Sequence, residues 1–171
     1  MKFEGIPLDS KQFAKELKVE WKGKIEYEWD CGIALSKFME GLKEGKILAR
    51  KCYACGRVMI PPRMFCESCF RPTDEWVELK DEGKILTFSV SFVNWDASRR
   101  KKPEVPAVIK LEGASENMGI LHKLGEVGDT LEEVLKNVKI GMKVKAVWKK
   151  EKEREGAITD ILYFKPVKRK K

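Results

Sequence analysis

Two C-x2-C pairs constrain this chain of 171 residues more than any other feature of its sequence. Cys52 and Cys55 form the first pair, Cys66 and Cys69 form the second, and ten residues separate the pairs. A C-x2-C turn lets two thiolates face one ion, so two such turns make a closed tetrahedral site with four cysteine ligands. Zinc and iron both suit this ligand set, and no coordination position is left for a substrate. The sequence therefore predicts a structural metal site.

An alternative for the same four cysteines is a set of buried or disulfide-bonded thiols that happen to share this spacing. Paired C-x2-C at this separation is among the more specific signals in a sequence, which favours the metal. Gly56 follows the first pair, where a positive φ is often required, and Pro61 and Pro62 stiffen the segment between the pairs. We expect a rubredoxin-like zinc ribbon at residues 50–72.

Residues 1–49 are predicted to form an arm of helices and extended chain. Suitable N-cap residues precede a helix over about 11–19, and apolar spacing predicts a second helix over 31–45 that ends at Gly45. Between them, residues 21–29 alternate loosely between apolar and charged side chains. This pattern predicts a strand or an extended arm.

Aromatic residues in this arm are candidates for a contact surface. Trp21, Tyr27 and Trp29 either pack on the body of the same chain or embrace a partner, because Trp and Tyr are favoured at interfaces. Phe38, on the apolar face of the second helix, is a further candidate for partner contact. Cys31 has no histidine nearby in the sequence, and we expect it to be a core or interface residue and not a nucleophile.

The segment 73–165 has the periodicity of strands and is predicted to form a barrel. After a short apolar run, alternation predicts five strands at about 84–93, 107–111, 118–124, 142–149 and 157–164, with a helix at 130–137. In that helix, Leu131, Val134 and Leu135 are expected to face inward. In the first strand, Leu86 and Phe88 are expected to face the core, and residues 94–106 are expected to form a polar loop. A helix between the third and fourth strands favours an OB-fold over an SH3-like barrel. The predicted fold is thus mainly β, with N-terminal helices.

The net charge of +8 is unevenly distributed. Residues 73–164 hold sixteen Lys or Arg and seventeen Asp or Glu, whereas the last seven residues hold five cations and no acid. The barrel is therefore nearly neutral, unlike a nucleic-acid groove, which should be basic along its own face. Residues 166–171 are expected to form a basic, disordered tail.

The sequence also predicts the compartment. No run of about 18 apolar residues occurs, so no transmembrane helix is expected. The N-terminal residues lack the basic and then apolar pattern of a signal peptide, which predicts a cytoplasmic protein. Reduced cysteines in that compartment agree with metal ligation.

Taken in order, these parts resemble one family. The segment KFMEGLKEGKILARKC, the ribbon pattern C-x2-C-G with P-P-R-x2-C-x2-C, and a barrel that begins EWVEL carry the resemblance over about residues 33–165. The chain is similar here to a zinc-ribbon plus OB-fold family long filed as a domain of unknown function. The family motif falls on Cys52, Cys55, Gly56, Pro61, Pro62, Arg63, Cys66 and Cys69, and Phe70 stands where a glycine is common.

The resemblance implies a non-catalytic accessory subunit of a thiolase-type or related acyl-CoA enzyme. In such a complex the ribbon and helices would dock on the catalytic subunit, and the barrel would lie near the coenzyme A channel. Phosphates of coenzyme A require cationic donors, and the densest cations near the barrel are Arg99, Arg100, Lys101 and Lys102. The alternative for these four residues is an ordinary solvated run of charge.

The residues that the chain lacks agree with a non-catalytic role. Acyl transfer requires an activated cysteine and histidine bases, but four cysteines are assigned to metal and His122 is the single histidine. We expect His122 to be a hydrogen-bonded residue of the barrel. Phosphate-loop, dinucleotide-binding and nucleophile-elbow motifs are absent from the sequence. Two alternatives stay open, a single-stranded nucleic-acid binder and a structural scaffold without a ligand.

Overall fold

A computed structural model describes residues 5, 7–17 and 22–167. The chain divides into two compact units, Met1–Asp30 and Cys31–Lys171, and each is described by itself. The division falls within the arm predicted for residues 1–49. Its second helix belongs with the larger unit because that helix buries its apolar face there.

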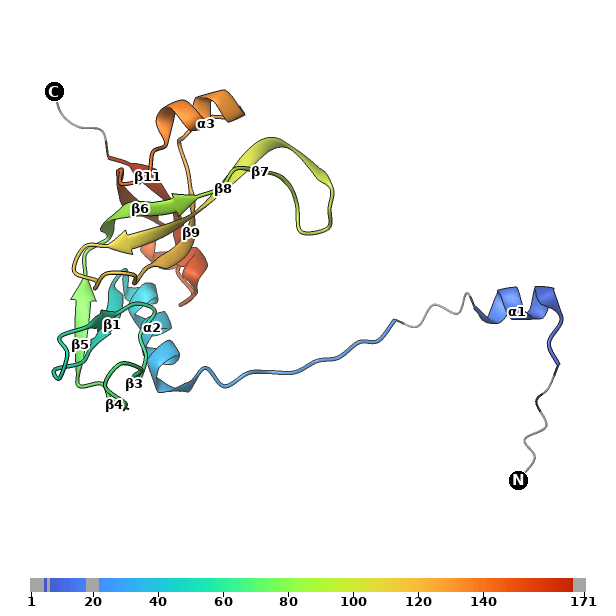
Figure 1. The fold of residues 1–171 in the computed structure, drawn as a ribbon, viewed down its shortest axis with the longest axis horizontal. Helices are drawn as coiled ribbons and strands as arrows, with labels where there is room; N and C mark the ends of the chain where they lie inside the picture. The colour runs from blue at the N-terminus through green and yellow to red at the C-terminus, as the bar shows by residue number, and fades with distance from the viewer. Residues whose placement is uncertain (1–4, 6, 18–21, 168–171) are drawn as a thin grey trace. The chain divides into compact units, whose positions relative to one another are not determined.

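The N-terminal unit holds helix α1 (Ser10–Glu16) and an extended segment (Figure 1). Asp9 caps the helix, since its carboxylate accepts the backbone N–H groups of Lys11 and Gln12 at 2.8 and 2.9 Å. The helix ends at Glu16, three residues before the predicted end.

Residues 22–29 are extended and pair with no strand in the part of the chain that the structure describes. Of the two predicted forms, the extended arm is therefore observed. Tyr27 and Trp29 are exposed, and their rings meet edge to face at a centroid distance of 5.7 Å. Trp21, the third aromatic candidate, lies outside the described residues.

Helix α2 (Gly32–Glu44) begins the larger unit and ends where the sequence predicts. Gly45 stops it with a φ of 78°, a conformation that glycine adopts without strain. Phe38 is only 3% exposed, so its side chain packs in the core and is not available for the partner contact that the sequence suggested. Cys31 is exposed at the N-cap of α2, so it is not a core residue, and its interface role stays a prediction.

Two small sheets build the ribbon. Strands β1 (Ile47–Lys51), β2 (Val58–Met59) and β5 (Glu75–Leu79) form one antiparallel sheet in the order β2-β1-β5, and β3 (Phe65–Cys66) pairs with β4 (Arg71–Pro72). Strand β5 falls within the range predicted for the barrel, yet all five of its residues pair with β1. By strand pairing, the barrel begins at β6.

Five strands close the barrel in the order β6-β8-β9-β11-β10, with β10 returning to β6. They are β6 (Glu82–Phe88), β8 (Arg99–Leu111), β9 (Ile120–Leu124), β10 (Lys143–Trp148) and β11 (Ile161–Pro166), and helix α3 (Leu131–Asn137) lies between β9 and β10. Neighbours are antiparallel except β9 and β11. This closed order confirms the predicted OB-fold.

The predicted polar loop at 94–106 is wrong. Strand β7 (Ser91–Val93) and the first half of β8 form a hairpin that projects from the barrel (Figure 1). Its turn is short, and the Asn94 N–H donates to the Ser98 carbonyl at 2.9 Å. The strand tolerates Pro103 because the β7–β8 register shifts there, so no ladder hydrogen bond is required of that residue.

Two predictions about which side chains face inward are also wrong. In β6 the core residue is Ile85, whereas Leu86 is 38% exposed, and a register shift against β8 follows at this point. In α3 only Val134 is buried, while Leu131 and Leu135 are exposed. Both segments offered adjacent apolar residues, and the bulge and helix orientation decided between them.

One apolar cluster joins α2, the ribbon sheet and the barrel, with Leu42, Ile47, Leu79, Ile109 and Phe164 among its buried members. None of the helices in the described part of the chain combines the length and apolar character that a membrane span requires. The C-terminal strand extends into the predicted tail.

In that strand, Pro166 belongs to β11, and the Val167 N–H donates to the Lys143 carbonyl at 3.0 Å. The segment predicted as tail therefore begins with two residues that have a place in the barrel sheet.

Candidate metal centre

The first cysteine pair lies in the turn between β1 and β2. The Cys52 N–H donates to the Arg57 carbonyl at 2.9 Å, and the Gly56 N–H donates to the Cys52 carbonyl at 2.8 Å. These bonds fold the chain tightly after Cys55, and Gly56 has a φ of 73°. The requirement for glycine that the sequence predicted is therefore observed.

The second pair lies in the turn between β3 and β4. At the position that corresponds to Gly56, Phe70 has a φ of 49°. This is the left-handed region, which costs a residue with a side chain more than it costs glycine. The backbone thus explains why a glycine is common here in the family that the chain resembles. The Phe70 ring is 82% exposed, so packing offsets little of this strain.

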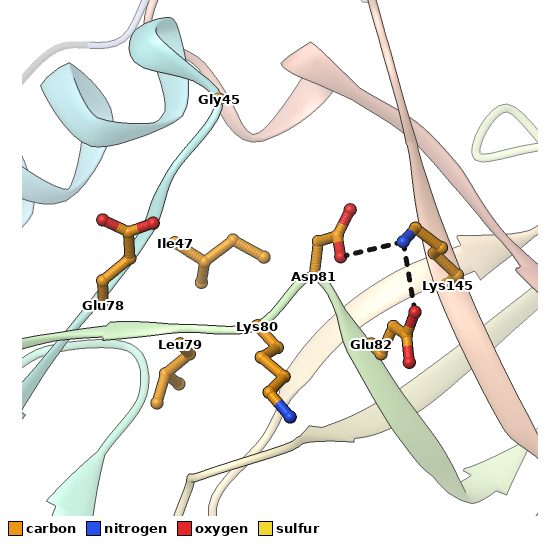
Figure 2. A pocket seen from close by; sticks show the side chains of 8 residues that line it. All are labelled: Gly45, Ile47, Glu78, Leu79, Lys80, Asp81, Glu82 and Lys145. Carbon is orange, nitrogen blue, oxygen red and sulfur yellow. Dashed lines mark hydrogen bonds and ion pairs between the residues drawn. The ribbon is translucent and has the colours of Figure 1, made fainter.

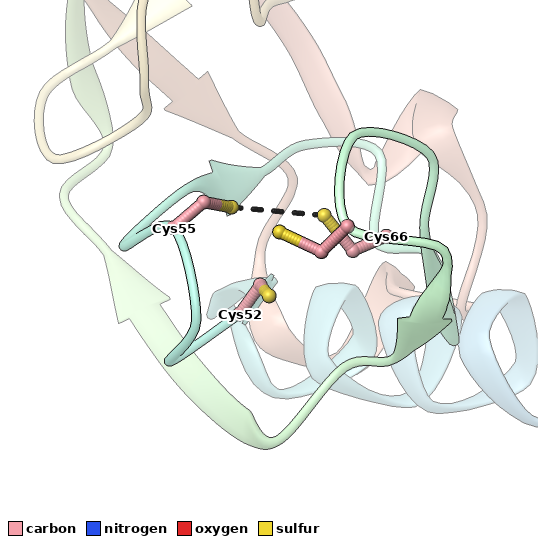
Figure 3. A group of neighbouring side chains, drawn as sticks. Cys52, Cys55 and Cys66 are labelled. Atoms are coloured by element: carbon pink, nitrogen blue, oxygen red, sulfur yellow. Dashed lines mark hydrogen bonds between the residues drawn. The ribbon is translucent and has the colours of Figure 1, made fainter.

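The two turns bring the four sulfurs together, all within 4.8 Å of one another. Cys55 and Cys66 approach to 3.7 Å between their Sγ atoms (Figure 3). A disulfide requires about 2.05 Å, so this is not one. Four sulfurs around one ion at bonds of about 2.3 Å lie roughly 3.8 Å apart, which this cluster matches. The donor set fits zinc or iron in a closed structural site.

Backbone amides and neighbouring sulfurs set the ionisation of these thiols. Burial opposes ionisation of Cys66, but the N–H groups of Cys69 and Ser68 donate to its sulfur and lower its pKa to about 7. The Cys55 sulfur, with burial, raises the pKa of Cys69 to about 12. Each thiolate is therefore formed at the expense of its neighbours, and a cation among the four removes that conflict.

Salt bridges and hydrogen bonds fix the two turns against each other. Arg57 from the first turn pairs with Glu67 of the second at 3.0 Å and also contacts the Ser68 hydroxyl. Asp74, just after the second turn, accepts the Tyr53 N–H at 2.7 Å. The metal ligands are thus held by contacts outside the ligand set.

A buried arginine that the sequence did not predict ties the ribbon to β5. The Arg50 Nε donates to the Thr73 hydroxyl at 2.9 Å, and its guanidinium also contacts the Thr73 carbonyl. Trp76 stacks beneath it, with 4.9 Å from Arg50 Cζ to the ring centroid, and Lys37 of α2 lies 5.0 Å from the same ring. No local pattern reveals such a residue, because its partners lie more than twenty positions away.

The four cations predicted to bind coenzyme A are all in β8, but they differ in their contacts. Arg100 donates to Asn94 at 2.9 Å and pairs with Glu104 at 3.2 Å, and Lys102 pairs with Asp129 at 2.5 Å. Arg99 and Lys101 are exposed and pair with no acid among the described residues. At the tip of the same hairpin, Trp95 is 99% exposed.

His122 is held within the barrel as predicted. Its Nε2 lies 3.3 Å from the Ile158 carbonyl, and its ring meets Phe164 edge to face at 5.6 Å. Cys31 lies at the N-cap of α2 and the other four cysteines form the cluster, and none of them is hydrogen-bonded to His122 in the described part of the chain.

A cavity of about 520 Å³ lies where the ribbon sheet meets the barrel, lined by Ile47, Glu78, Leu79 and Lys80, among others (Figure 2). On its barrel side, Lys145 pairs with Asp81 at 3.5 Å and with Glu82 at 3.1 Å. One lysine thus pairs with two of its carboxylates, and neither histidine nor cysteine lines it. We therefore interpret the cavity as a gap between the packed ribbon sheet and the barrel, and not as a catalytic site.

Comparison with known proteins agrees with this architecture. A family model described as the ChsH2 rubredoxin-like zinc ribbon domain matches residues 39–75, and one described as the ChsH2 C-terminal OB-fold domain matches residues 76–149. A DUF35 domain-containing scaffold protein of Methanocaldococcus jannaschii is 34% identical over 124 residues, which cover 71% of this chain and 82% of that protein. The chain belongs to the DUF35 family.

Other DUF35 proteins extend the comparison. A scaffold protein of Methanothermobacter thermautotrophicus is 30% identical over 121 residues, covering 68% of this chain and 83% of that protein. A DUF35 crystal structure from Sulfolobus solfataricus has a TM-score of 0.55 at 30% identity and covers 68% of this chain and 78% of that one. The Ltp2-ChsH2(DUF35) aldolase has a TM-score of 0.56 at 21% identity, covering 81% and 98%, and this likeness shows the fold alone.

Proposed function

We propose that this DUF35 protein is a non-catalytic accessory subunit of a thiolase-type acyl-CoA enzyme, in which the catalytic subunit supplies the cysteine and histidine. The observation that carries the proposal is family membership, because the relatives are named scaffold proteins. One structural neighbour is the DUF35 component of an aldolase, which supports a partner with catalytic activity. The chain's own chemistry agrees, since its four clustered thiols leave no open coordination position for a substrate.

The projecting hairpin is the part of the barrel that we expect to reach the partner's coenzyme A channel. Arg99 and Lys101 have free cationic heads, whereas Arg100 and Lys102 are engaged in ion pairs, among the residues that the structure describes. The first two are therefore the donors we assign to the phosphates of the ligand, and Trp95 is available to pack against the partner. Arg100 and Lys102 would stiffen the hairpin.

The arm at residues 22–29 is the second surface available for docking. Tyr27 and Trp29 are exposed and already packed against each other, so little side-chain entropy is lost when a partner covers them. Trp21 remains a prediction from the sequence.

Purification from the native source tests the proposed function. A tagged chain should bring down a thiolase-type subunit in fixed ratio, identified by mass spectrometry, and the complex should cleave or form acyl-CoA. An alternative result, a chain that purifies alone and binds oligonucleotides with steep salt dependence, would contradict the proposal and favour a nucleic-acid binder.

The hairpin assignment has its own test in that complex. The double substitution Arg99→Ala and Lys101→Ala should raise the KM for acyl-CoA while assembly survives. Lys136→Ala with Lys152→Ala serves as the control that removes two charges from exposed positions outside the hairpin. Equal KM values for the wild type and the first variant in an intact complex would overturn the assignment.

A further inference from the structure

Three lysines stand in register across three neighbouring barrel strands. Lys84 of β6 lies directly opposite Lys143 of β10, and on its other side it lies directly opposite Lys110 of β8. Directly opposite residues in antiparallel strands point to the same face. We call Lys84, Lys110 and Lys143 the lysine row.

The neighbouring position on the same two strands shows how unusual this row is. There Glu82 faces Lys145, and the two side chains form an ion pair at 3.1 Å (Figure 2). Side chains directly opposite each other have Cβ atoms roughly 5 Å apart, so like charges at that position destabilise a sheet. Opposite charges therefore face each other at the Glu82–Lys145 position, whereas like charges face each other at the Lys84–Lys143 position.

Acidic side chains near the row relieve only one of its members. Lys110 contacts the exposed carboxylate of Glu116. The side chains of Lys84 and Lys143 make no ion pair or hydrogen bond with any residue that the structure describes. The remaining charge of the row is therefore at least two.

The lysine row faces open space that a ligand can occupy. All three lysines line a cavity of about 320 Å³, together with Gly83 and Gly113. The carboxylates of Glu82 and Glu112 also line it, but each pairs with a lysine outside the row, Lys145 and Lys80 respectively. Lys84 and Lys143 also line a cavity of about 1100 Å³, and Lys139 adds a further cation to it. The first volume is in the range of small-molecule sites, and the second lies slightly above that range.

We propose that the lysine row binds the diphosphate group of a small molecule. Strands are spaced by about 4.8 Å, so three lysines in register span roughly 10 Å, which exceeds what a single phosphate can contact. Lysine acts as a mobile point charge toward phosphate oxygens, and an anion between Lys84 and Lys143 replaces their repulsion with two attractions.

This site is independent of the proposed function. Lys110 and the hairpin cations lie at opposite ends of β8, and the test uses the chain alone. A result that refutes the lysine row therefore leaves the proposed accessory-subunit function unaffected, and the reverse also holds.

Calorimetric titration with inorganic pyrophosphate, and with orthophosphate for comparison, tests the proposal on the full chain. Pyrophosphate should bind at least tenfold more tightly than orthophosphate, and Lys84→Gln with Lys143→Gln should abolish binding. Lys136→Gln with Lys152→Gln removes the same net charge from exposed positions and should leave binding unchanged. ADP is titrated next, and tighter binding of ADP than of pyrophosphate would identify the source as a nucleotide, whereas the reverse would identify free pyrophosphate.

A second variant keeps the proposal open to refutation if the first is poorly folded. Lys143→Glu should create an opposite-charge pair with Lys84, raise the thermal midpoint of the free protein at low salt, and remove pyrophosphate binding. Deletion of residues 168–171 should leave binding intact. Pyrophosphate binding that disappears with this tail, or that persists in Lys143→Glu, would overturn the lysine row as its site.

Discussion

The ribbon and the barrel of this chain are each stabilised in a different way. Strands β2, β3 and β4 are two residues long, so the ribbon has little backbone pairing of its own, and its centre is four thiols. The barrel closes five strands around buried aliphatic residues and Phe164. A small segment that cannot bury enough apolar surface depends on a metal, whereas a closed sheet does not.

Removal of one metal ligand should produce the largest difference in stability between the ribbon and the barrel. Structural zinc in small modules contributes an apparent binding free energy of roughly 10–16 kcal/mol, which exceeds what the ribbon contacts can replace. In Cys66→Ser, we expect loss of the bound metal and loss of hydrogen-exchange protection for amides of residues 52–72. Amides of β8 and β9 should keep their protection.

Cys31→Ser is the matched control, because Cys31 is exposed and remote from the cluster in sequence. It should retain one metal ion per chain by elemental analysis. A Cys66→Ser protein whose ribbon amides stay protected without metal would show that contacts such as Arg57–Glu67 suffice to hold the turns.

The barrel has a buried polar centre that can be compared with the metal site. The carboxylate of Asp160 is fully buried and accepts the N–H groups of Glu155, Gly156 and Ala157, the shortest at 2.7 Å, with Lys149 at 3.4 Å. In Asp160→Asn we expect a loss of about 2–3 kcal/mol in the free energy of unfolding, since an amide group opposes these donors. Urea denaturation measures it.

The dependence on pH sharpens this prediction. Burial raises the pKa of Asp160, but the backbone donors outweigh it and hold the pKa below its ordinary value. The stabilisation is therefore complete above the unfolded pKa of about 3.9 and is lost as the pH falls through the lower folded pKa. The difference between the wild type and Asp160→Asn should shrink below about pH 4. A difference that is constant from pH 7 to pH 3 would contradict the assigned role.

The two cysteine turns allow a smaller comparison within the ribbon. Phe70→Gly should relieve left-handed strain and stabilise the ribbon by about 1 kcal/mol, whereas Gly56→Ala should destabilise it by a similar amount. Competition with a chelator measures both as changes in metal affinity. Phe70→Ala keeps the strain while removing the ring, so equal affinities for Phe70→Ala and Phe70→Gly would refute this explanation.

The sequence predicted those features that depend on local spacing. The four cysteine ligands and the αL residue at Gly56 follow from a turn of a few residues, and the barrel order follows from strand periodicity and the place of one helix. Prediction failed where contacts between residues far apart in the sequence determine burial or secondary structure. Arg50 became a buried residue through Thr73 and Trp76, and the charged segment at Arg99 became a strand through pairing with β7.

The inward face of β6 illustrates the same limit. Ile85 and Leu86 are equally apolar, and the choice between them depends on a register shift against β8 that no alternation in β6 itself encodes. The lysine row was likewise invisible, since its members come from strands that are adjacent only in the closed barrel.

The most direct test of a non-catalytic role is the turnover of the assembled complex after removal of the chain's reactive side chains. Cys31→Ser and His122→Gln together eliminate the free thiol and the single imidazole while leaving the four clustered cysteines in place. With the metal content and subunit ratio confirmed, kcat for acyl-CoA should equal that of the wild-type complex. A kcat lower by tenfold or more in a fully assembled, metal-loaded complex would contradict the proposal that this subunit supplies no catalytic group.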